Sequence, residues 1–325
     1  MMKLQDLMKS LNNPSALNKL SLKWMEEYKA YIFKKGVDYI SQCGDDDLIF
    51  IFDTYEEELL AEWFLNPLVS NKLLTSQGDK EATVFLGSRF LEVLHYKGGL
   101  HFPTFKSEYP QTVHTIPLNA GDDVMFQGMD EQYGILKSPS EIEVIINKLG
   151  TSLAMLKSKH SDAYEFITCC NLMLVLRDDS SNELSYSSGS YDGYPGLTLL
   201  ANAQQERISE ARIIDSLYHE AIHTMIYMYE EVNGKLLKQS YDREIKLTSP
   251  WSGASLGLNQ FAQAIFVWKG LMYLNDALEV SGLNYTSSNA KKGFANNPSQ
   301  MFLKEGGYEH ASPNTIELFE GFSIL

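Results

Sequence analysis

The chain has 325 residues, of which 44% are apolar and 12% aromatic, and its formal net charge of -15 gives a sequence pI near 4.9. This much apolar material suits a globular protein with a sizeable core, in one large domain or two. The acidic surface that the charge predicts would repel phosphate backbones, so we expect no nucleic-acid partner.

The cysteines and the N-terminus indicate where the chain resides. Cys43, Cys169 and Cys170 are odd in number and stand in apolar stretches, which favours free thiols in a reducing compartment. The N-terminal sequence MMKLQDLMKSLNN is amphipathic and lacks the continuous apolar core of a signal peptide. No run of eighteen apolar residues is present, so we expect no membrane span and a cytoplasmic location.

The first part of the chain reads as mostly helical up to about residue 80. Apolar spacing predicts a helix over 17–35, then two helices within 48–74 that are separated near Pro67. The pattern changes between 82 and 124, where Thr112–Asn119 resembles a strand. Three isolated histidines lie in this part, and isolated histidines are more often surface or core residues than ligands: His95, His101 and His114.

The middle of the chain alternates helix and strand signals. A capped, proline-initiated segment predicts a helix over 138–150, continued by another from 152 to about 160. The apolar run Phe166–Asp179 predicts a buried strand. The loop sequence SSGSYDGYPG comes next, and Leu197–Leu200 predicts a second short strand.

The next segment holds the motif H-E-x-x-H, formed by His219, Glu220 and His223. Apolar residues at spacings of three and four predict a helix that begins after Ser209 and stops at Gly234. Residues four apart lie one turn apart on the same helix face, so the two imidazoles can bind one metal ion. Glu220 then stands beside the metal as a candidate base.

The C-terminal part contains a connection, a long helix and a polar tail. Residues 234–253 read as irregular, Ser255–Leu278 as a second long aromatic helix, 287–300 as a mobile or disordered loop, and Thr315–Phe322 as helical. These elements predict a mainly helical α+β fold with a small sheet next to the H-E-x-x-H helix. We divide the chain into a helical region 1–160 and a metal-site region 161–325, which can also form one continuous domain.

A third ligand decides which chemistry two histidines support. The metzincin pattern is excluded because Ile226 and Tyr229 occupy its glycine and histidine positions. In the gluzincin pattern the third ligand is a downstream glutamate, for which Glu244 is the candidate, although exposed glutamates in connections are common. His310 is the only histidine after the motif and is a further alternative.

A family resemblance supplies another option. The span Leu172–Leu274 resembles the HExxH-motif family of peptide-modifying enzymes of ribosomal peptide pathways, several of which are iron(II)/2-oxoglutarate-dependent peptide β-hydroxylases. This span is about a third of the chain, and the similar stretches within it are Ser187–Leu200, Leu217–Glu231, and Ser249–Gly253 with the aromatic helix QAIFVWKGLMYL. The resemblance implies a metal held by His219 and His223, with open positions for 2-oxoglutarate and oxygen.

The chain departs from this family at two positions. Gln263 stands where the family has a histidine, and Ser252 stands where an arginine usually comes after the proline–tryptophan pair. Gln263, with Asn259 one turn earlier, is then the candidate third ligand. The substitutes for the arginine as partners of a 2-oxoglutarate carboxylate are Arg212, Arg243 and Lys269.

These patterns support three functions. The resemblance implies an Fe(II)/2-oxoglutarate-dependent hydroxylase that acts on a peptide or peptide-like substrate. A Zn(II) metallopeptidase is the first alternative, with Glu220 as the base that activates a metal-bound water. The second is a non-catalytic peptide-binding protein, because Gln263 is a weaker ligand than imidazole. The sequence predicts no particular oligomeric state.

Overall fold

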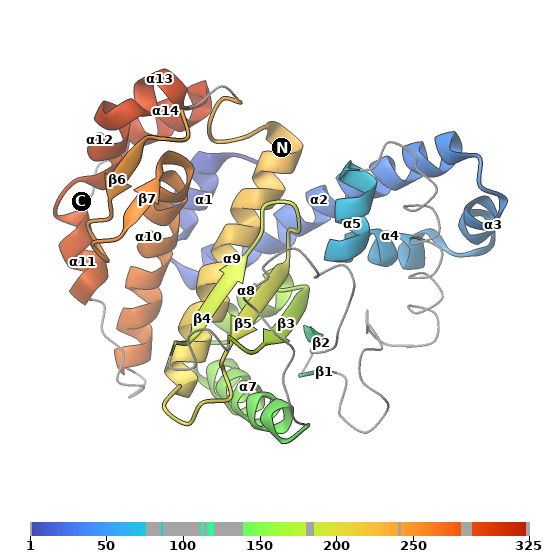
Figure 1. Cartoon of the computed structure of the whole chain (residues 1–325), viewed down its shortest axis with the longest axis horizontal. Coiled ribbons are helices and arrows are strands. Elements are labelled where there is room, and N and C mark those ends of the chain that lie inside the picture. Colours follow the sequence, from blue (N-terminus) through green and yellow to red (C-terminus); the bar gives the residue numbers. More distant parts are fainter. Residues whose placement is uncertain are drawn as a thin grey trace.

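A computed structural model describes residues 2–75, 86, 112–113, 116–119, 139–179, 185–239, 242–280 and 288–322 (Figure 1). The N-terminal helices are α1 (Leu4–Ser10), α2 (Pro14–Cys43), α3 (Asp46–Thr54), α4 (Glu57–Leu65) and α5 (Pro67–Thr75). The central helices are α7 (Pro139–Lys159), α8 (Ser161–Cys170), α9 (Glu210–Asn233) and α10 (Leu258–Val280). The C-terminal turns are α11 (Ser288–Phe294), α12 (Pro298–Phe302), η3 (Leu303–Gly307), α13 (Tyr308–His310) and α14 (Pro313–Glu320).

A small mixed sheet stands beside the central helices. Its strands are β1 (Thr112–Val113), β2 (Ile116–Asn119), β3 (Met173–Arg177), β5 (Leu197–Ala201) and β4 (Ser187–Ser190), in this spatial order. Strands β2, β3 and β5 are parallel, whereas β4 pairs with β5 in the antiparallel direction and ends the order. A separate two-stranded ribbon joins β6 (Lys246–Thr248) to β7 (Ser255–Gly257) just before α10.

Both faces of the sheet are covered, which explains why β3 and β5 are apolar except for Arg177 and Thr198. Every residue of these two strands is buried. Leu174 and Leu176 belong to the large core formed with the helices, while Met173 and Val175 face a smaller cluster with Leu68 of α5. Because successive strand residues point to opposite faces, one apolar run fills both layers.

Helix α9 is the centre of this arrangement and crosses behind β4 and β5, with α10 alongside it (Figure 1). Its N-terminus is capped by Ser209, whose hydroxyl accepts the Arg212 N–H, and it is buried on most of its circumference. Buried hydrogen bonds fix α9 against its neighbours: Thr224 Oγ1 accepts the Gly196 N–H, and Asn171 donates to the Leu217 carbonyl.

A glycine allows α10 to approach α9 closely. A Cβ at Gly270 would lie 2.5 Å from Ile222 Cδ1 and 3.4 Å from a Tyr218 ring carbon, so any larger residue would force Ile222 to move at this crossing. On the other side of α9, helix α2 packs against α8 and α9 and brings the N-terminal region into the same core.

The structure confirms the predicted class, a mainly helical α+β fold with a small sheet next to the H-E-x-x-H helix and a second long aromatic helix. The bounds predicted for α9 agree with the structure, as does the strand at Leu197–Leu200. The helices predicted within 17–35 and 48–74 are present, and the latter stretch contains α3, α4 and α5. The division of the chain at residue 160 stays a prediction.

Two predictions in the second half of the chain are wrong. Residues 166–170 are the last turns of α8 and not the start of a strand, because Ala163, Phe166, Ile167 and Cys170 bury one helical face. An apolar run alone does not distinguish a buried helix from a buried strand. The stretch 287–300, expected as a mobile loop, forms α11 and most of α12 over its described residues.

Smaller differences concern element ends. The two helices predicted on either side of Gly150 are one continuous helix, α7. The first residues of the helix predicted over Ser255–Leu278 belong to β7, and the strand predicted over Thr112–Asn119 is divided between β1 and β2. His95, His101 and His114 lie outside the described residues.

In the part of the chain that the structure describes, every helix is too short or too polar to cross a lipid bilayer.

Two helix-interior glycines form a matched pair for a stability test. A Cβ at Gly36 of α2 would lie 2.5 Å from the ring of buried Phe64, whereas a Cβ at Gly150 of α7 would meet nothing within 4 Å. We expect Gly36→Ala to lower the free energy of unfolding by about 1–3 kcal/mol through overpacking. Gly150→Ala should raise it by roughly 0.5–1 kcal/mol, because alanine favours the helix. Urea unfolding of both variants measures this, and equal shifts would contradict the close packing at Gly36.

Candidate metal centre

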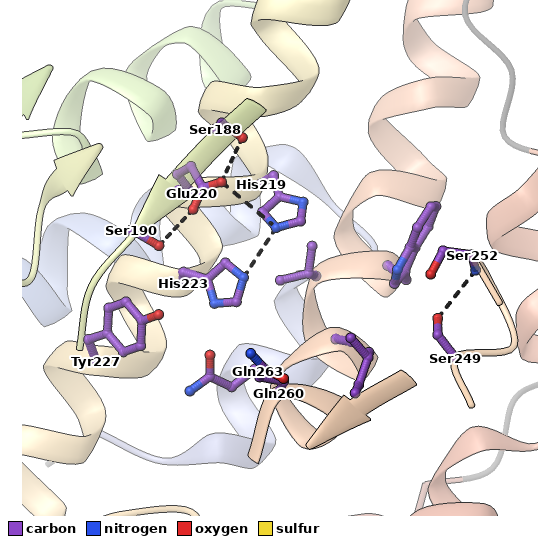
Figure 2. A pocket seen from close by; sticks show the side chains of 15 residues that line it. Ser188, Ser190, His219, Glu220, His223, Tyr227, Ser249, Ser252, Gln260 and Gln263 are labelled. Carbon is purple, nitrogen blue, oxygen red and sulfur yellow. Dashed lines mark hydrogen bonds and ion pairs between the residues drawn. The ribbon is translucent and has the colours of Figure 1, made fainter. Parts of the chain in front are cut away.

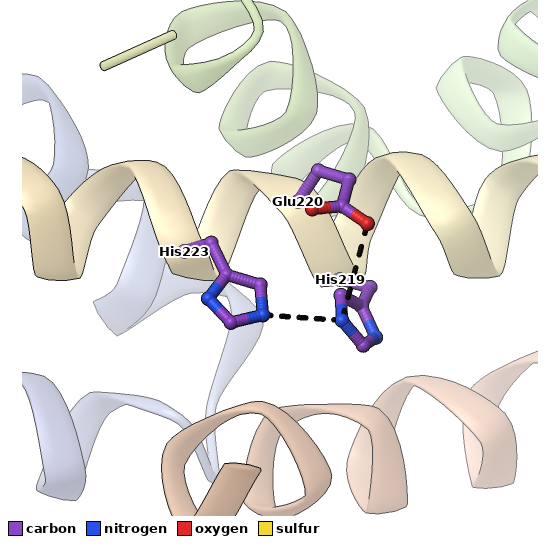
Figure 3. Close-up of side chains that lie close together, drawn as sticks. All are labelled: His219, Glu220 and His223. Atoms are coloured by element: carbon purple, nitrogen blue, oxygen red, sulfur yellow. Dashed lines mark hydrogen bonds and ion pairs between the residues drawn. The ribbon is translucent and has the colours of Figure 1, made fainter. Parts of the chain in front are cut away.

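Helix α9 presents the two motif histidines on one face (Figure 3). His219 and His223 are one turn apart, and their Nε2 atoms lie 3.2 Å from each other. The side chain of His219 is 35% exposed, while that of Glu220 is only 3% exposed. Suitable donor atoms of His219, Glu220 and His223 all lie within 4.8 Å of one another, so the three residues form a group that could hold a metal ion.

The separation of the two imidazoles fits a shared metal ion. Metal–nitrogen bonds of about 2.1 Å place two nitrogens about 3.0 Å apart at a right angle and about 3.4 Å apart at the tetrahedral angle. The observed Nε2–Nε2 distance of 3.2 Å lies between these values. The two donors therefore suit either a four-coordinate zinc or a higher-coordinate iron(II) ion.

His223 is held in its neutral form, which a metal ligand requires. Burial, with a smaller contribution from the neighbouring His219, lowers the pKa of His223 to about 4. Glu220 and a side-chain hydrogen bond with Gln263 act in the opposite direction. The ring also stacks on Tyr227, with centroids 5.8 Å apart and planes 22° apart. Neutral imidazole is the form that coordinates metals.

Glu220 is anchored by the edge strand β4 (Figure 2). Ser188 donates to Oε1 at 2.8 Å and Ser190 donates to Oε2 at 2.6 Å. Oε1 lies 3.9 Å from His219 Nε2. The carboxylate therefore stands beside the histidine pair with both oxygens already accepting hydrogen bonds.

A pocket of about 410 Å³ opens in front of the histidines. Residues of β4 and α9 line one side, and α10 and the Ser249–Ser252 turn line the other (Figure 2). The lining is mixed: it combines hydroxyls, two glutamines, the motif residues and the aromatic rings of Tyr227 and Trp268 with the apolar side chains of Leu256, Ala264 and Val267. Among its described residues, none is lysine or arginine. The volume is in the range of small-ligand sites.

Gln263 lies where a third ligand could contribute. It is buried on α10, lines the pocket and lies close enough to His223 to influence its pKa. Asn259 is not among the lining residues. Gln260, one position later, lines the pocket with Gln263, Ala264 and Val267, because these residues share one face of α10.

The predicted cosubstrate-binding cations lie away from this pocket lining. Arg212 is half-exposed in the first turn of α9, pairs with Asp215 at 3.1 Å and lies over the Tyr186 ring. Arg243 is exposed in the turn before β6. Lys269 is buried on α10, where its ammonium lies 5.6 Å from the Tyr273 ring centre and 5.4 Å from that of Phe322. Burial lowers the pKa of Lys269.

The alternative third ligands are also apart from the histidine pair. Glu244 is exposed, and its backbone N–H donates to Asp242 in a turn. His310 ends α13, where its Nε2 lies 3.7 Å from Glu309. Neither residue lines the pocket or belongs to the metal-binding group among the described residues.

The proline–tryptophan pair shapes the pocket indirectly. Trp251 stacks on Trp268, which lines the pocket, with ring centroids 5.9 Å apart and planes 6° apart. A Cβ at Gly293 of α11 would lie 2.0 Å from the Trp251 ring, so this glycine makes room for the indole. Ser249 and Ser252, on either side of the pair, line the pocket directly.

Ser188, Ser190, Tyr227 and Gln260 are site residues that were not predicted individually. Ser188 and Ser190 alternate in the loop sequence SSGSYDGYPG, and Tyr227 continues the four-residue spacing of His219 and His223. These signals are weak because serine-rich stretches favour loops and an aromatic residue at helical spacing usually belongs to a core.

Comparison with protein-family models and with curated proteins gave no match for this chain. The chemistry of the site therefore has to be inferred from its own residues.

His219→Ala and His223→Ala should each abolish stoichiometric metal binding, because one imidazole cannot hold the ion alone. His310→Ala is the matched control and should keep it. Equilibrium dialysis with Zn(II) or Fe(II), followed by metal analysis, measures the stoichiometry. Unchanged metal content in both motif variants would refute the site.

Gln263→His should strengthen Zn(II) binding by about tenfold or more, because an imidazole replaces a weak amide donor next to His223. Gln260→His is the matched control, since Gln260 also lines the pocket but accepts the Gly257 N–H. Competition with a zinc chelator measures both affinities. Equal gains in the two variants would show that Gln263 has no special position.

Proposed function

We propose that this chain is a metal-dependent enzyme that modifies a peptide or peptide-like substrate. The observation that carries the proposal is the His219–His223 pair, with its Nε2 atoms 3.2 Å apart at the wall of a 410 Å³ pocket. Two imidazole nitrogens at this separation are suited to bind one metal ion. The resemblance to HExxH-motif peptide-modifying enzymes supplies the substrate class.

The first candidate chemistry is Fe(II)/2-oxoglutarate-dependent hydroxylation. His219 and His223 would hold the metal, which together with 2-oxoglutarate and oxygen supplies the oxidant for a C–H bond. The third ligand would come from Gln263 or from outside the protein. The hydroxyls of Ser249 and Ser252 are donors for an acidic ligand group, and Trp268 provides an apolar wall that excludes water.

Zinc-dependent peptide hydrolysis is the second candidate, and the position of Glu220 favours it. Its Oε1 lies 3.9 Å from His219 Nε2, in the buried position of a base next to a metal-bound water. The described pocket lining contains no lysine or arginine, and a peptide amide needs no such cationic partner. Glu244 does not line this pocket, so hydrolysis would use another third ligand.

Anaerobic addition of Fe(II) and then 2-oxoglutarate to the metal-free protein tests the first chemistry. We expect a visible charge-transfer band from the chelated keto acid, and we expect it to be absent in His219→Ala. His310→Ala should retain the band. Tight zinc binding without any such band would favour hydrolysis, and Glu220→Gln should then abolish peptide cleavage while zinc stays bound.

A further inference from the structure

Glu220 is restrained by two hydroxyls from a different element of the fold. Ser188 and Ser190 are two residues apart on β4, so both side chains point to the face that α9 covers. Each donates to a different carboxylate oxygen, at 2.8 and 2.6 Å. A Cβ placed on Gly189, which stands between them, would meet no atom within 4 Å. The strand therefore presents two donors to one buried carboxylate.

Tyr227 stands beside this hydrogen-bonded group at the pocket. It lines the pocket together with Ser190, and its hydroxyl interacts with Ser190. Since the Ser190 proton is donated to Glu220, the Ser190 oxygen can still accept a hydrogen bond from a neighbouring group.

The restraint sets the distance between Glu220 and the metal position. Oε1 lies 3.9 Å from His219 Nε2, and a glutamate side chain without partners would rotate freely about its torsions. A buried carboxylate needs hydrogen bonds to offset its lost hydration, and the two serines provide them. Without them, coordination of the metal would be the nearest replacement.

We propose that Ser188 and Ser190 are positioning residues that hold Glu220 beside the metal but outside its coordination sphere. A carboxylate oxygen has more than one acceptor site, so Oε1 can still accept a proton or hydrogen bond from a metal-bound water or a substrate. The proposal rests on the proposed metal-dependent function. It assigns to the edge strand the task of keeping Glu220 available for chemistry and keeping a coordination position open.

Cobalt(II) is a suitable probe because its visible spectrum changes with the number and type of ligands. We expect Ser188→Ala/Ser190→Ala to bind one Co(II), as the unaltered chain does, but with shifted band positions and intensities because Glu220 becomes a ligand. The same two substitutions in a Glu220→Gln background should leave the spectrum of that background unchanged. Such a dependence on Glu220 is not expected of a general structural effect.

Ser187→Ala is the matched control, because Ser187 belongs to the same strand but points to the opposite face. The Co(II) spectrum of this variant should equal that of the unaltered chain. Circular dichroism checks the fold, and if the double variant does not fold, each single serine variant should show a smaller shift in the same direction. Co(II) binding with an identical spectrum in all the serine variants would overturn the positioning role alone. Failure of the unaltered chain to bind Co(II) would overturn both this role and the metal site.

Discussion

The burial of α9 is the constraint on which the rest of the structure depends. The helix packs against α2, α7, α8 and α10 and against two strands of the sheet, so its position is determined from most directions. Its Thr224 hydroxyl and Leu217 carbonyl also accept hydrogen bonds from neighbouring elements. A rigidly held helix can keep two imidazoles at a separation suited to a metal without an ion to organise them, which lowers the entropic cost of binding.

The pocket forms where this packing is interrupted. Gly270 allows α9 and α10 to touch closely, whereas Gln263, two turns earlier on α10, lies opposite His223 with space between the helices. The Trp251–Trp268 stack then supports the far wall, and Gly293 gives Trp251 its room. The tryptophan pair therefore supports the shape of the pocket, although Trp251 itself lies outside the pocket lining.

The sequence predicts those parts of the fold that depend on local patterns. Helix α9 has a serine cap, a 3.6-residue apolar period and a terminal glycine. These local signals predict its bounds, and the helical period places its two histidines on one face. Phe166–Cys170 is an apolar run whose helical state is not evident from those five residues alone. The helical spacing appears only when Ala163 is included, because Ala163, Phe166, Ile167 and Cys170 then share the buried face of α8, a helix that packs against α2 and α9. The hydrogen bonds from Ser188 and Ser190 to Glu220 join residues that are 32 and 30 positions apart in the sequence. Such contacts arise from the packing of β4 against α9 and not from spacing along the chain.

Charge distinguishes the two candidate chemistries at this site. 2-Oxoglutarate carries two carboxylates, and the described pocket lining offers it hydroxyls and amides while placing the Glu220 carboxylate nearby. Neutral donors form weaker hydrogen bonds to a carboxylate than arginine does. A solvent molecule can take the place of an amide ligand on a metal, but no described lining residue offers a guanidinium to a carboxylate. A peptide amide needs no guanidinium partner. The described lining therefore suits a ligand that is neutral where it touches the pocket. A dianion would bind there mainly through the metal.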